Sequence, residues 1–396
     1  MVTDYDIPAF FAEWSQLDQP AYLRFLYEFV PTIDPRKAVA GLCAEQSTAM
    51  WQRVGVVEDL RERFGAKVIR LEPVGDVAQG RWLVEIAHPH RNFGARLPNL
   101  LVAAAGEGTF YAPGVAAITL LDITFPAGYL AEFAGPQFGL HGVREQLQIH
   151  ERPFFIGVVK PNLGLSPADF AALAFEAWCG GLDMAKDDEM QADTSWSTLR
   201  GRVTCVSERR QRAEQLTGER KGFIANCIDE VDRIPEQCHI AERAGATAVM
   251  ISPVWTGLSA LRALRRVSGV PVMAHFAGVA VLTRRPQGGI ASALLTRLMR
   301  IAGADMIGFA GFGDRMQTAP DEVRANIHAC LEPLGAIAPA LPIPGGSDSA
   351  QTLAHVAQQV GHVDFGFIAG RGVFGHAEGP RAGARSIREV WTQLHV

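Results

Sequence analysis

The chain has 396 residues, 48% hydrophobic and 20% charged, which is the composition of an ordinary soluble globular protein long enough for two domains. The net charge of −5, with no basic stripe interleaved with aromatics, argues against a nucleic-acid partner, and no apolar run approaches membrane-spanning length. The first residues lack a signal-peptide pattern and the six cysteines form no Cys-x-x-Cys pair, so we expect a cytoplasmic protein with neither disulfides nor zinc.

The N-terminal part, residues 1–134, mixes helical and strand patterns without a fixed period. Residues 67–73 and 81–87 alternate between apolar and polar side chains, which predicts strands, and the glycines at 106 and 108 predict a turn. We therefore expect an α+β domain over residues 1–134.

Residues 135–396 show a regular alternation of strand-like and helical segments. Ser166 is a plausible N-cap for a helix that begins at Pro167 and is ended by Gly180 and Gly181. Eight strand–helix units over roughly 250 residues are typical of a (β/α)₈ TIM barrel, so we expect an α/β protein with this barrel as its C-terminal domain. The apolar runs that predict the eight strands are 154–159, 182–185, 223–228, 248–251, 270–275, 306–310, 341–343 and 365–369.

The reactive residues fall after the predicted strands, where the active sites of such barrels lie. Glycine-rich loops after strands seven and eight commonly bind a phosphate through backbone N–H groups. In chain order, the polar residues at this rim are Lys160, Lys186 to Glu189, Asn226 and His275, and the glycines are Gly345, Gly346, Gly370 and Gly372.

The second predicted strand ends in Lys186, Asp187, Asp188 and Glu189. Carboxylate oxygens suit Mg²⁺, and a desolvated, neutral lysine can react with CO₂ to give a carbamate, which is a further anionic oxygen ligand. This predicts a Mg²⁺ site. A lysine that forms an imine with substrate, either Lys160 or Lys186, is the alternative, although the neighbouring carboxylates favour the metal.

Two stretches together resemble the large subunit of ribulose bisphosphate carboxylase/oxygenase (RuBisCO), namely GVVKPNLGLS at 157–166 and GGLDMAKDDE at 180–189. The resemblance covers nearly the whole chain, with further matches at 44–51 (AEQSTAMW), 120–126 (LLDITFP), 135–140 (GPQFGL) and 375–379 (GHAEG). It implies a ferredoxin-like N-terminal domain and a homodimer in which Glu45 and Trp51 of one chain reach the barrel rim of the other.

The resemblance also implies a role for each matching residue. Lys186 would be the carbamylated ligand, with Asp188 and Glu189 as the other Mg²⁺ ligands, and His275 matches a histidine of the carboxylase site. Lys160 would assist enolisation, and its place at the end of a buried strand predicts that it is desolvated. The residues implied to bind substrate or phosphate are Glu45, Trp51, Asn162, Asn226, Gly345, Gly346, Gly370 and Gly372, and Arg371 is an added cation that could bind a carboxylate or phosphate.

Several family residues are replaced here. The second lysine of strand one is Asn162, and the loop at 310–316 offers no lysine, only Asp314 and Arg315. The other replacements are Phe276 for an arginine, Val279 and Gly308 for histidines, Pro344 for a serine and Gly108 for an asparagine.

The resemblance implies two phosphate sites, and the second loses its arginine, histidine and serine, which are Phe276, Gly308 and Pro344 here. The pattern therefore resembles the RuBisCO-like (form IV) branch, which does not fix CO₂. We predict Mg²⁺-dependent enolisation of a monophosphorylated sugar derivative, by an isomerase or tautomerase. A decarboxylase of a β-keto sugar-acid phosphate and a non-catalytic homologue remain alternatives.

Overall fold

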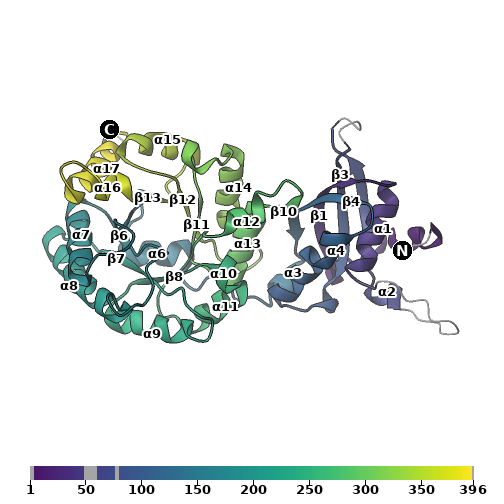
Figure 1. Ribbon diagram of the computed structural model, residues 1–396, viewed down its shortest axis with the longest axis horizontal. Helices are drawn as coiled ribbons and strands as arrows, with labels where there is room; N and C mark the ends of the chain where they lie inside the picture. The colour runs from purple at the N-terminus through teal and green to yellow at the C-terminus, as the bar shows by residue number, and fades with distance from the viewer. Residues whose placement is uncertain (1–3, 49–59, 76–79, 395–396) are drawn as a thin grey trace. The chain divides into compact units, whose positions relative to one another are not determined.

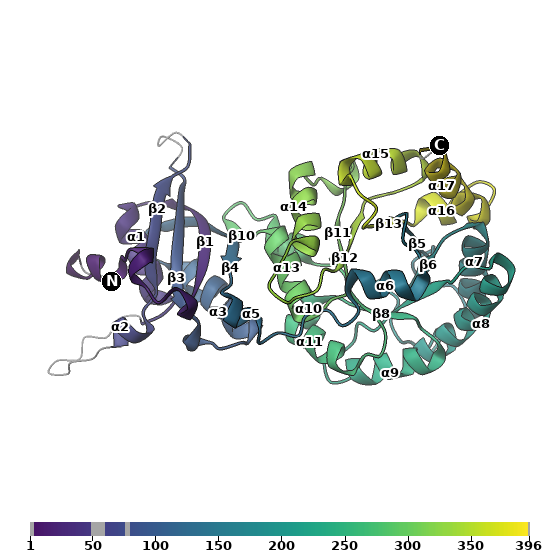
Figure 2. The same ribbon diagram turned by 180° about the vertical axis from the view of Figure 1, so that it is seen from behind.

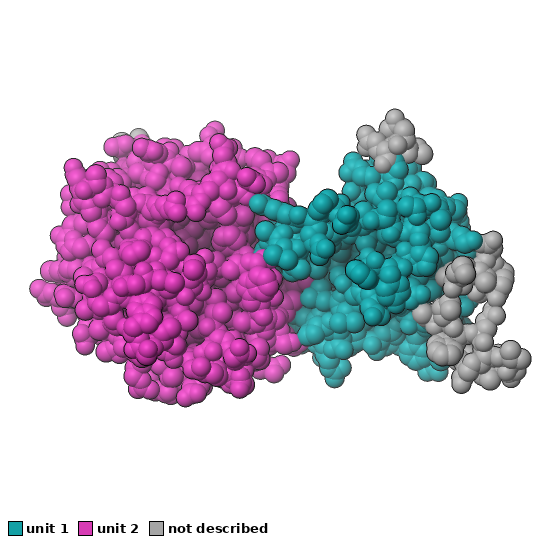
Figure 3. Space-filling view, viewed as in Figure 1, with its two compact units in different colours: residues 1–133, 279–295 teal, residues 134–278, 296–396 magenta. Residues whose placement is uncertain are grey.

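The computed structural model describes residues 4–48, 60–75 and 80–394, which form two compact units (Figure 1 and Figure 2). Unit 1 comprises Met1–Phe133 and Val279–Leu295, and unit 2 comprises Ala134–Gly278 and Thr296–Val396 (Figure 3). The segment Val279–Leu295 thus belongs to unit 1, although it follows the fifth strand of the barrel in sequence. No helix in the described part of the chain is both long and apolar enough to cross a membrane.

Unit 1 is built on a mixed sheet with the strand order β10-β4-β1-β3-β2. Strands β1, β2, β3 and β4 pair in an antiparallel manner, and β10 adds to β4 in parallel. With α1 between β1 and β2 and α3 between β3 and β4, this is the βαββαβ order of a ferredoxin-like domain, and the predicted α+β domain is confirmed. The strands are β1 (Tyr22–Pro31), β2 (Lys67–Pro73), β3 (Trp82–Pro89), β4 (Val115–Thr124) and β10 (Gly288–Ile290).

Alternation along β1 fixes the buried face of this sheet. Leu23, Phe25, Tyr27 and Phe29 are buried while their neighbours are only partly covered, which is the period of two that a strand requires. The turn predicted at 106–108 is wrong, because Gly106 ends α3 and Gly108 lies inside the short helix α4. The helices are η1 (Asp4–Phe10), η2 (Trp14–Gln16), η3 (Gln19–Ala21), α1 (Pro35–Glu45), α2 (Leu60–Phe64), η5 (His90–Asn92), α3 (Leu97–Ala105), α4 (Glu107–Tyr111), α5 (Ala127–Leu130) and α12 (Val279–Thr283).

Unit 2 is a closed parallel barrel whose strands follow one another in chain order. The predicted TIM barrel is confirmed, with strand ends that differ from the expected ranges by a few residues. The strands are β5 (Phe154–Val158), β6 (Met184–Lys186), β7 (Gly222–Asn226), β8 (Ala248–Ile251), β9 (Val272–Ala274), β11 (Met306–Ala310), β12 (Leu341–Gly345) and β13 (Gly366–Ala369).

The helices of unit 2 surround the barrel (Figure 1). Helix α7 has the predicted ends, because the Ser166 hydroxyl accepts a hydrogen bond from Asp169 N and Gly181 stops the helix at φ 117°. The helices are α6 (Gly139–Leu147), α7 (Pro167–Gly180), α8 (Leu199–Thr217), α9 (Ile234–Ala244), α10 (Pro253–Thr256), α11 (Leu258–Val267), η6 (Asp314–Met316), α14 (Pro320–Leu331), α15 (Ala350–Val360), α16 (Arg371–Phe374) and α17 (Pro380–Leu394), and α13 (Ser292–Ala302) spans the division between the units.

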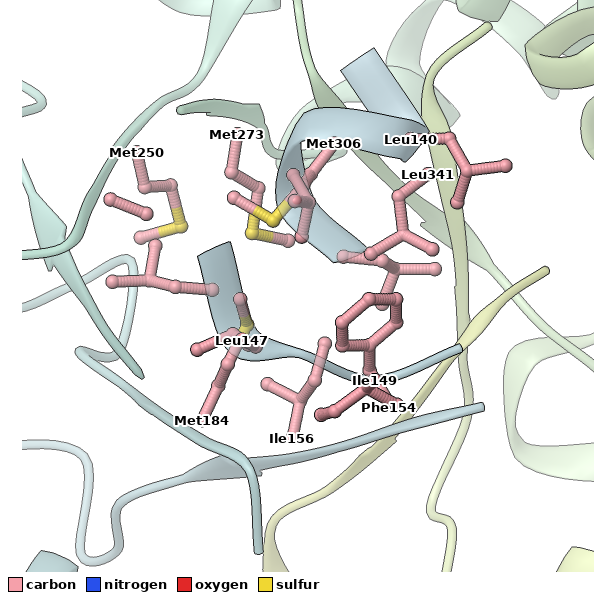
Figure 4. Close-up of a cluster of buried hydrophobic side chains, with 14 residues drawn as sticks. Leu140, Leu147, Ile149, Phe154, Ile156, Met184, Met250, Met273, Met306 and Leu341 are labelled. Carbon is pink, nitrogen blue, oxygen red and sulfur yellow. The ribbon is translucent and has the colours of Figure 1, made fainter. Parts of the chain in front are cut away.

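Helix α6 packs its apolar face against side chains from the amino ends of the barrel strands. Leu140, Val143 and Leu147 of this helix form one buried cluster with residues that begin several strands, such as Phe154 and Met306 (Figure 4). Four methionines, on β6, β8, β9 and β11, fill the irregular space in this cluster. Since the core closes this end of the barrel, polar chemistry is left to the carboxyl ends of the strands.

Candidate active site at the carboxyl ends of the barrel strands

Strands β5 and β6 bring the two lysines of the site together. Val158 is the register partner of Lys186, and Val159 N donates to the Lys186 carbonyl at 3.2 Å. Because the two strands are parallel, the loops that carry Lys160 and Asp188 start side by side at the same end of the barrel.

Lys186 is the last residue of β6 and is fully buried. Its Nζ donates to the Asp187 carbonyl at 2.7 Å and lies 3.6 Å from Oε2 of Glu189. Burial lowers the pKa of Lys186, and the nearby carboxylates of Glu189 and Asp188 oppose that effect. A larger fraction of Lys186 than of an exposed lysine is therefore in the neutral amine form, which is the form that reacts with CO₂.

Lys160 is held by the neighbouring carboxylate. Its Nζ lies 2.6 Å from Oδ2 of Asp188 and 3.0 Å from Oδ1 of Asn162, and its side chain is 26% exposed. The sequence predicted a desolvated Lys160, and the structure shows a side chain that is only partly buried. Asp188 is buried and also accepts a hydrogen bond from Met190 N at 3.2 Å.

Asp187 and its neighbour Asp188 have different hydrogen-bond partners. It is buried and accepts hydrogen bonds from Arg202 Nε at 2.9 Å, Arg202 Nη2 at 3.1 Å and Asn226 N at 2.9 Å. Arg202 lies on α8 and is itself buried. Of the three carboxylates in the sequence motif, Asp187 thus serves an internal ion pair, which leaves Asp188 and Glu189 for the site.

His275 follows β9 and faces Glu189. Its Nε2 lies 3.4 Å from Oε2 of Glu189, while Ala277 N donates to Nδ1 at 3.2 Å, which assigns the proton of the neutral ring to Nε2. Burial first, and then the positive charges of Lys186 and Lys160, hold the pKa of His275 well below its usual value. The ring is stacked on Phe276 with a centroid distance of 4.8 Å.

The carboxylates near Lys186 can form a site for a hard cation such as Mg²⁺ only if Lys186 itself supplies a further oxygen ligand. Within the described residues, no three His, Cys, Asp or Glu side chains lie together as a metal-binding group. The carboxylate of Glu189 lies 3.6 Å from Lys186 Nζ, and that of Asp188 is near enough to act on the same amine electrostatically. A carbamate on Lys186 would supply the third anionic oxygen, and its burial favours the neutral amine from which a carbamate forms.

Asn226 ends β7 and binds the loop that follows β6. Its Nδ2 donates to the carbonyls of Glu189 at 3.1 Å and Gln191 at 3.3 Å, and its Oδ1 accepts from Ile228 N at 3.1 Å. In this arrangement the side chain positions the backbone of Glu189.

The glycine loops after β12 and β13 lie against each other and against Lys160. A Cβ at Gly370 would lie 3.2 Å from Lys160 Cε, and a Cβ at Gly372 would lie 2.5 Å from the Asp348 carbonyl oxygen. These glycines therefore permit close packing of the two loops. Gly345 is the last residue of β12, and Gly346 N donates to Oδ2 of Asp348 at 3.3 Å.

Two charged residues flank these loops. Asp348 is buried, and burial raises its pKa to about 7. The polar local sequence Ser-Asp-Ser did not predict this burial. Arg371 begins α16 between Gly370 and Gly372 and is exposed. Its side chain makes neither an ion pair nor a hydrogen bond with any described residue.

Three positions where family donors are replaced carry no polar side chain here. A Cβ at Gly308 would lie 3.1 Å from Met273 Cε and 3.6 Å from the Phe276 ring, so Gly308 and Phe276 are adjacent. Pro344 is buried on β12 and is the register partner of Phe309. This side of the barrel mouth is apolar at all three positions.

Two of the predicted site residues belong to unit 1. Glu45 ends α1 and lines a cavity of about 700 Å³ together with Gln46, His88 and Gly108. A Cβ at Gly108 would lie 2.9 Å from Gln46 Cγ, so a larger residue there would require the Gln46 side chain to move. Trp51 lies outside the described residues.

Comparisons with known proteins agree with this architecture. Residues 139–395 match the family described as ribulose bisphosphate carboxylase large chain, catalytic domain, and residues 20–129 match the N-terminal domain of the same chain. A ribulose bisphosphate carboxylase-like protein of Allochromatium vinosum is 51% identical over 99% of this chain and 89% of its own length.

Two solved structures are similar over nearly the whole chain. Octameric RuBisCO from Pyrococcus horikoshii superposes with a TM-score of 0.90 at 30% identity, covering 96% of this chain and 90% of that one. The dimeric archaeal RuBisCO from Hyperthermus butylicus gives a TM-score of 0.88 at 28% identity, covering 98% and 94%.

Proposed function

Because the chain belongs to the ribulose bisphosphate carboxylase large-chain family, we propose that it is a RuBisCO-like enzyme that enolises a phosphorylated keto compound without fixing CO₂. The observation that carries this proposal is the fully buried Lys186, which lies 3.6 Å from the carboxylate of Glu189 and within the electrostatic reach of Asp188. A barrel kept only for its fold has no need of a buried lysine at this position, since burying a charged group is costly.

Mg²⁺ would be held by Asp188, Glu189 and a carbamate on Lys186. When bound, it would act as a Lewis acid for a substrate carbonyl and so stabilise an enediolate. The neighbouring Asp187 would not take part, because Arg202 and the backbone of Asn226 already occupy both of its oxygens.

Lys160 is the residue we propose to move the proton at the carbon next to the carbonyl. Its Nζ is within hydrogen-bond distance of Asp188. The Lys160 side chain is 26% exposed, so it can meet a substrate above that carboxylate. His275, with its Nε2–H directed at Glu189, would hold that carboxylate in place or donate to a substrate oxygen.

The substrate we propose carries a phosphate at one end, bound by the loops at Gly345–Gly346 and 370–372. Arg371 supplies a cation beside those glycines. The other end of a bisphosphate would meet Phe276, Gly308 and Pro344, which offer no side-chain donor, so a second phosphate would have to be desolvated without compensation.

Proton transfer alone would make the protein an isomerase or tautomerase. The same enolate from a β-keto acid would make it a decarboxylase, and Arg371 could bind the carboxylate of such a substrate. An imine at Lys186 is disfavoured, because its Nζ is fully buried against Asp187 and Glu189.

A homodimer is the assembly we propose, with Glu45 and Trp51 of one chain at the barrel rim of the other. One of the similar solved structures is described as a dimeric archaeal RuBisCO, which supports the proposal. Light scattering should give the mass of two chains, and a fully active monomer would overturn this part.

The enolase function is tested by proton exchange in heavy water. The protein, supplied with Mg²⁺ and bicarbonate, is incubated with a panel of ketose and keto-acid monophosphates, and proton NMR follows loss of the signal next to the carbonyl. We expect exchange with at least one compound and none for Lys186→Ala. Absence of exchange across the panel, or equal exchange by the variant, would contradict the proposal.

A further inference from the structure

The β11–α14 loop and the β12–α15 loop touch along their backbones. Gly311 N donates to the Gly345 carbonyl at 2.9 Å, and a Cβ at Gly311 would lie only 2.8 Å from Gly345 N. A Cβ at Gly346 would lie 2.8 Å from the Phe312 carbonyl oxygen. This contact requires glycine on both sides, so the residues after Gly311 are held against the glycine pair Gly345–Gly346.

Arg315 is the cation that this contact brings to the glycine pair. Its Nη1 donates to the Ser347 hydroxyl at 3.0 Å, and both side chains are exposed. Ser347 directly follows Gly346 and has φ 64°, a left-handed conformation that is strained for a residue with a side chain. Strained backbone of this kind concentrates at sites where loops bind ligands.

The glycine pair by itself is a poor anion site. The N–H of Gly346 is already engaged by Asp348, whose buried carboxylate would repel a phosphate when it is ionised. Asp314, next to Arg315, adds another negative charge on the exposed side. A phosphate at this place therefore needs a cation, and Arg315 is fixed there by a hydrogen bond.

We propose that Arg315 is a phosphate-binding residue, which exchanges its hydrogen bond to Ser347 for bonds to a phosphate at Gly346 and Ser347. The guanidinium presents its N–H groups in a planar fork that matches phosphate oxygens. The proposal rests on the proposed function only in taking the substrate to be phosphorylated. It assigns binding to a loop that carries no lysine in this chain.

Inorganic phosphate tests this inference independently of the metal and the carbamate. Phosphate is titrated into the full-length protein in the presence of a chelator, and binding is followed by phosphorus NMR. Arg315→Gln should weaken binding by about 10- to 100-fold, the loss expected for a hydrogen bond to a charged group. Arg315→Lys should recover part of the affinity, because it restores the charge without the fork.

Arg243→Gln is the matched control. Arg243 lies on α9 in the same unit and is exposed, so its loss changes the net charge equally without touching the loops. Unchanged affinity in this control together with the loss in Arg315→Gln supports the proposal. Equal affinities for the two variants, or no measurable phosphate binding by the unmodified protein, would overturn it. Neither result would bear on proton exchange in the metal-loaded protein, where the proposed function is tested.

Discussion

Asp187 and Asp188 are adjacent in sequence, yet replacing Asp187 by alanine should mainly lower stability, whereas replacing Asp188 should mainly abolish Mg²⁺ binding. Asp187→Ala removes the carboxylate that receives two hydrogen bonds from Arg202 and one from Asn226 N. Both members of this pair are buried, so the variant leaves a guanidinium without its counter-charge in the protein interior. Breaking one side of a buried ion pair typically costs about 3–5 kcal/mol.

Urea unfolding, followed by tryptophan fluorescence, measures the effect. Asp187→Ala should lower the free energy of unfolding by about 3–5 kcal/mol, and adding Arg202→Met should recover much of it, because an apolar pair leaves no buried charge. Asp188→Ala is the control. Its partner Lys160 is partly exposed and can be hydrated, so stability should fall less while Mg²⁺ binding is lost. If Asp187→Ala were as stable as the unmodified protein, the internal role of Asp187 would be refuted.

Three further predictions follow from the site. Lys160→Met should abolish exchange of the substrate proton with solvent deuterium but leave Mg²⁺ binding, measured by calorimetry, nearly intact; persistent exchange would place the base elsewhere. Asp348 has a pKa raised from 3.8 to about 7, so the free energy of unfolding should fall as pH rises between these values. Asp348→Asn should remove up to about 4 kcal/mol of that loss. The same pH profile of stability in the variant and the unmodified protein would contradict this. With labelled bicarbonate and ribulose bisphosphate, fixation should not exceed that of a Lys186→Ala control, and any excess would refute the loss of carboxylation.

Hydrophobic pattern was sufficient to predict the barrel, because each buried parallel strand is a short apolar run between glycine-rich turns. The exact strand ends were not predictable, since pairing decides them. The run at 182–185 predicted a strand that is observed at Met184–Lys186. Strand β10 was missed because Gly-Gly-Ile carries no strand pattern, and it forms only through its pairing with β4.

The structure brings several of the predicted site residues together at the carboxyl ends of the strands, but their partners could not be predicted from the sequence. Lys186 ends β6 and Lys160 follows β5, and only the structure shows that Lys186 is fully covered while Lys160 stays partly exposed. Arg202 follows Asp187 by 15 positions on another element, so no local spacing reveals their pairing. The burial of Asp348 likewise depends on how two loops meet.

The central claim is that Lys186 becomes a carbamate that completes a Mg²⁺ site. Carbon NMR with isotopically labelled bicarbonate tests it most directly, in the presence of Mg²⁺ and at mildly alkaline pH. The account predicts a carbamate resonance in the unmodified protein that disappears in Lys186→Ala. No resonance in the unmodified protein, or one that persists in the variant, would contradict it.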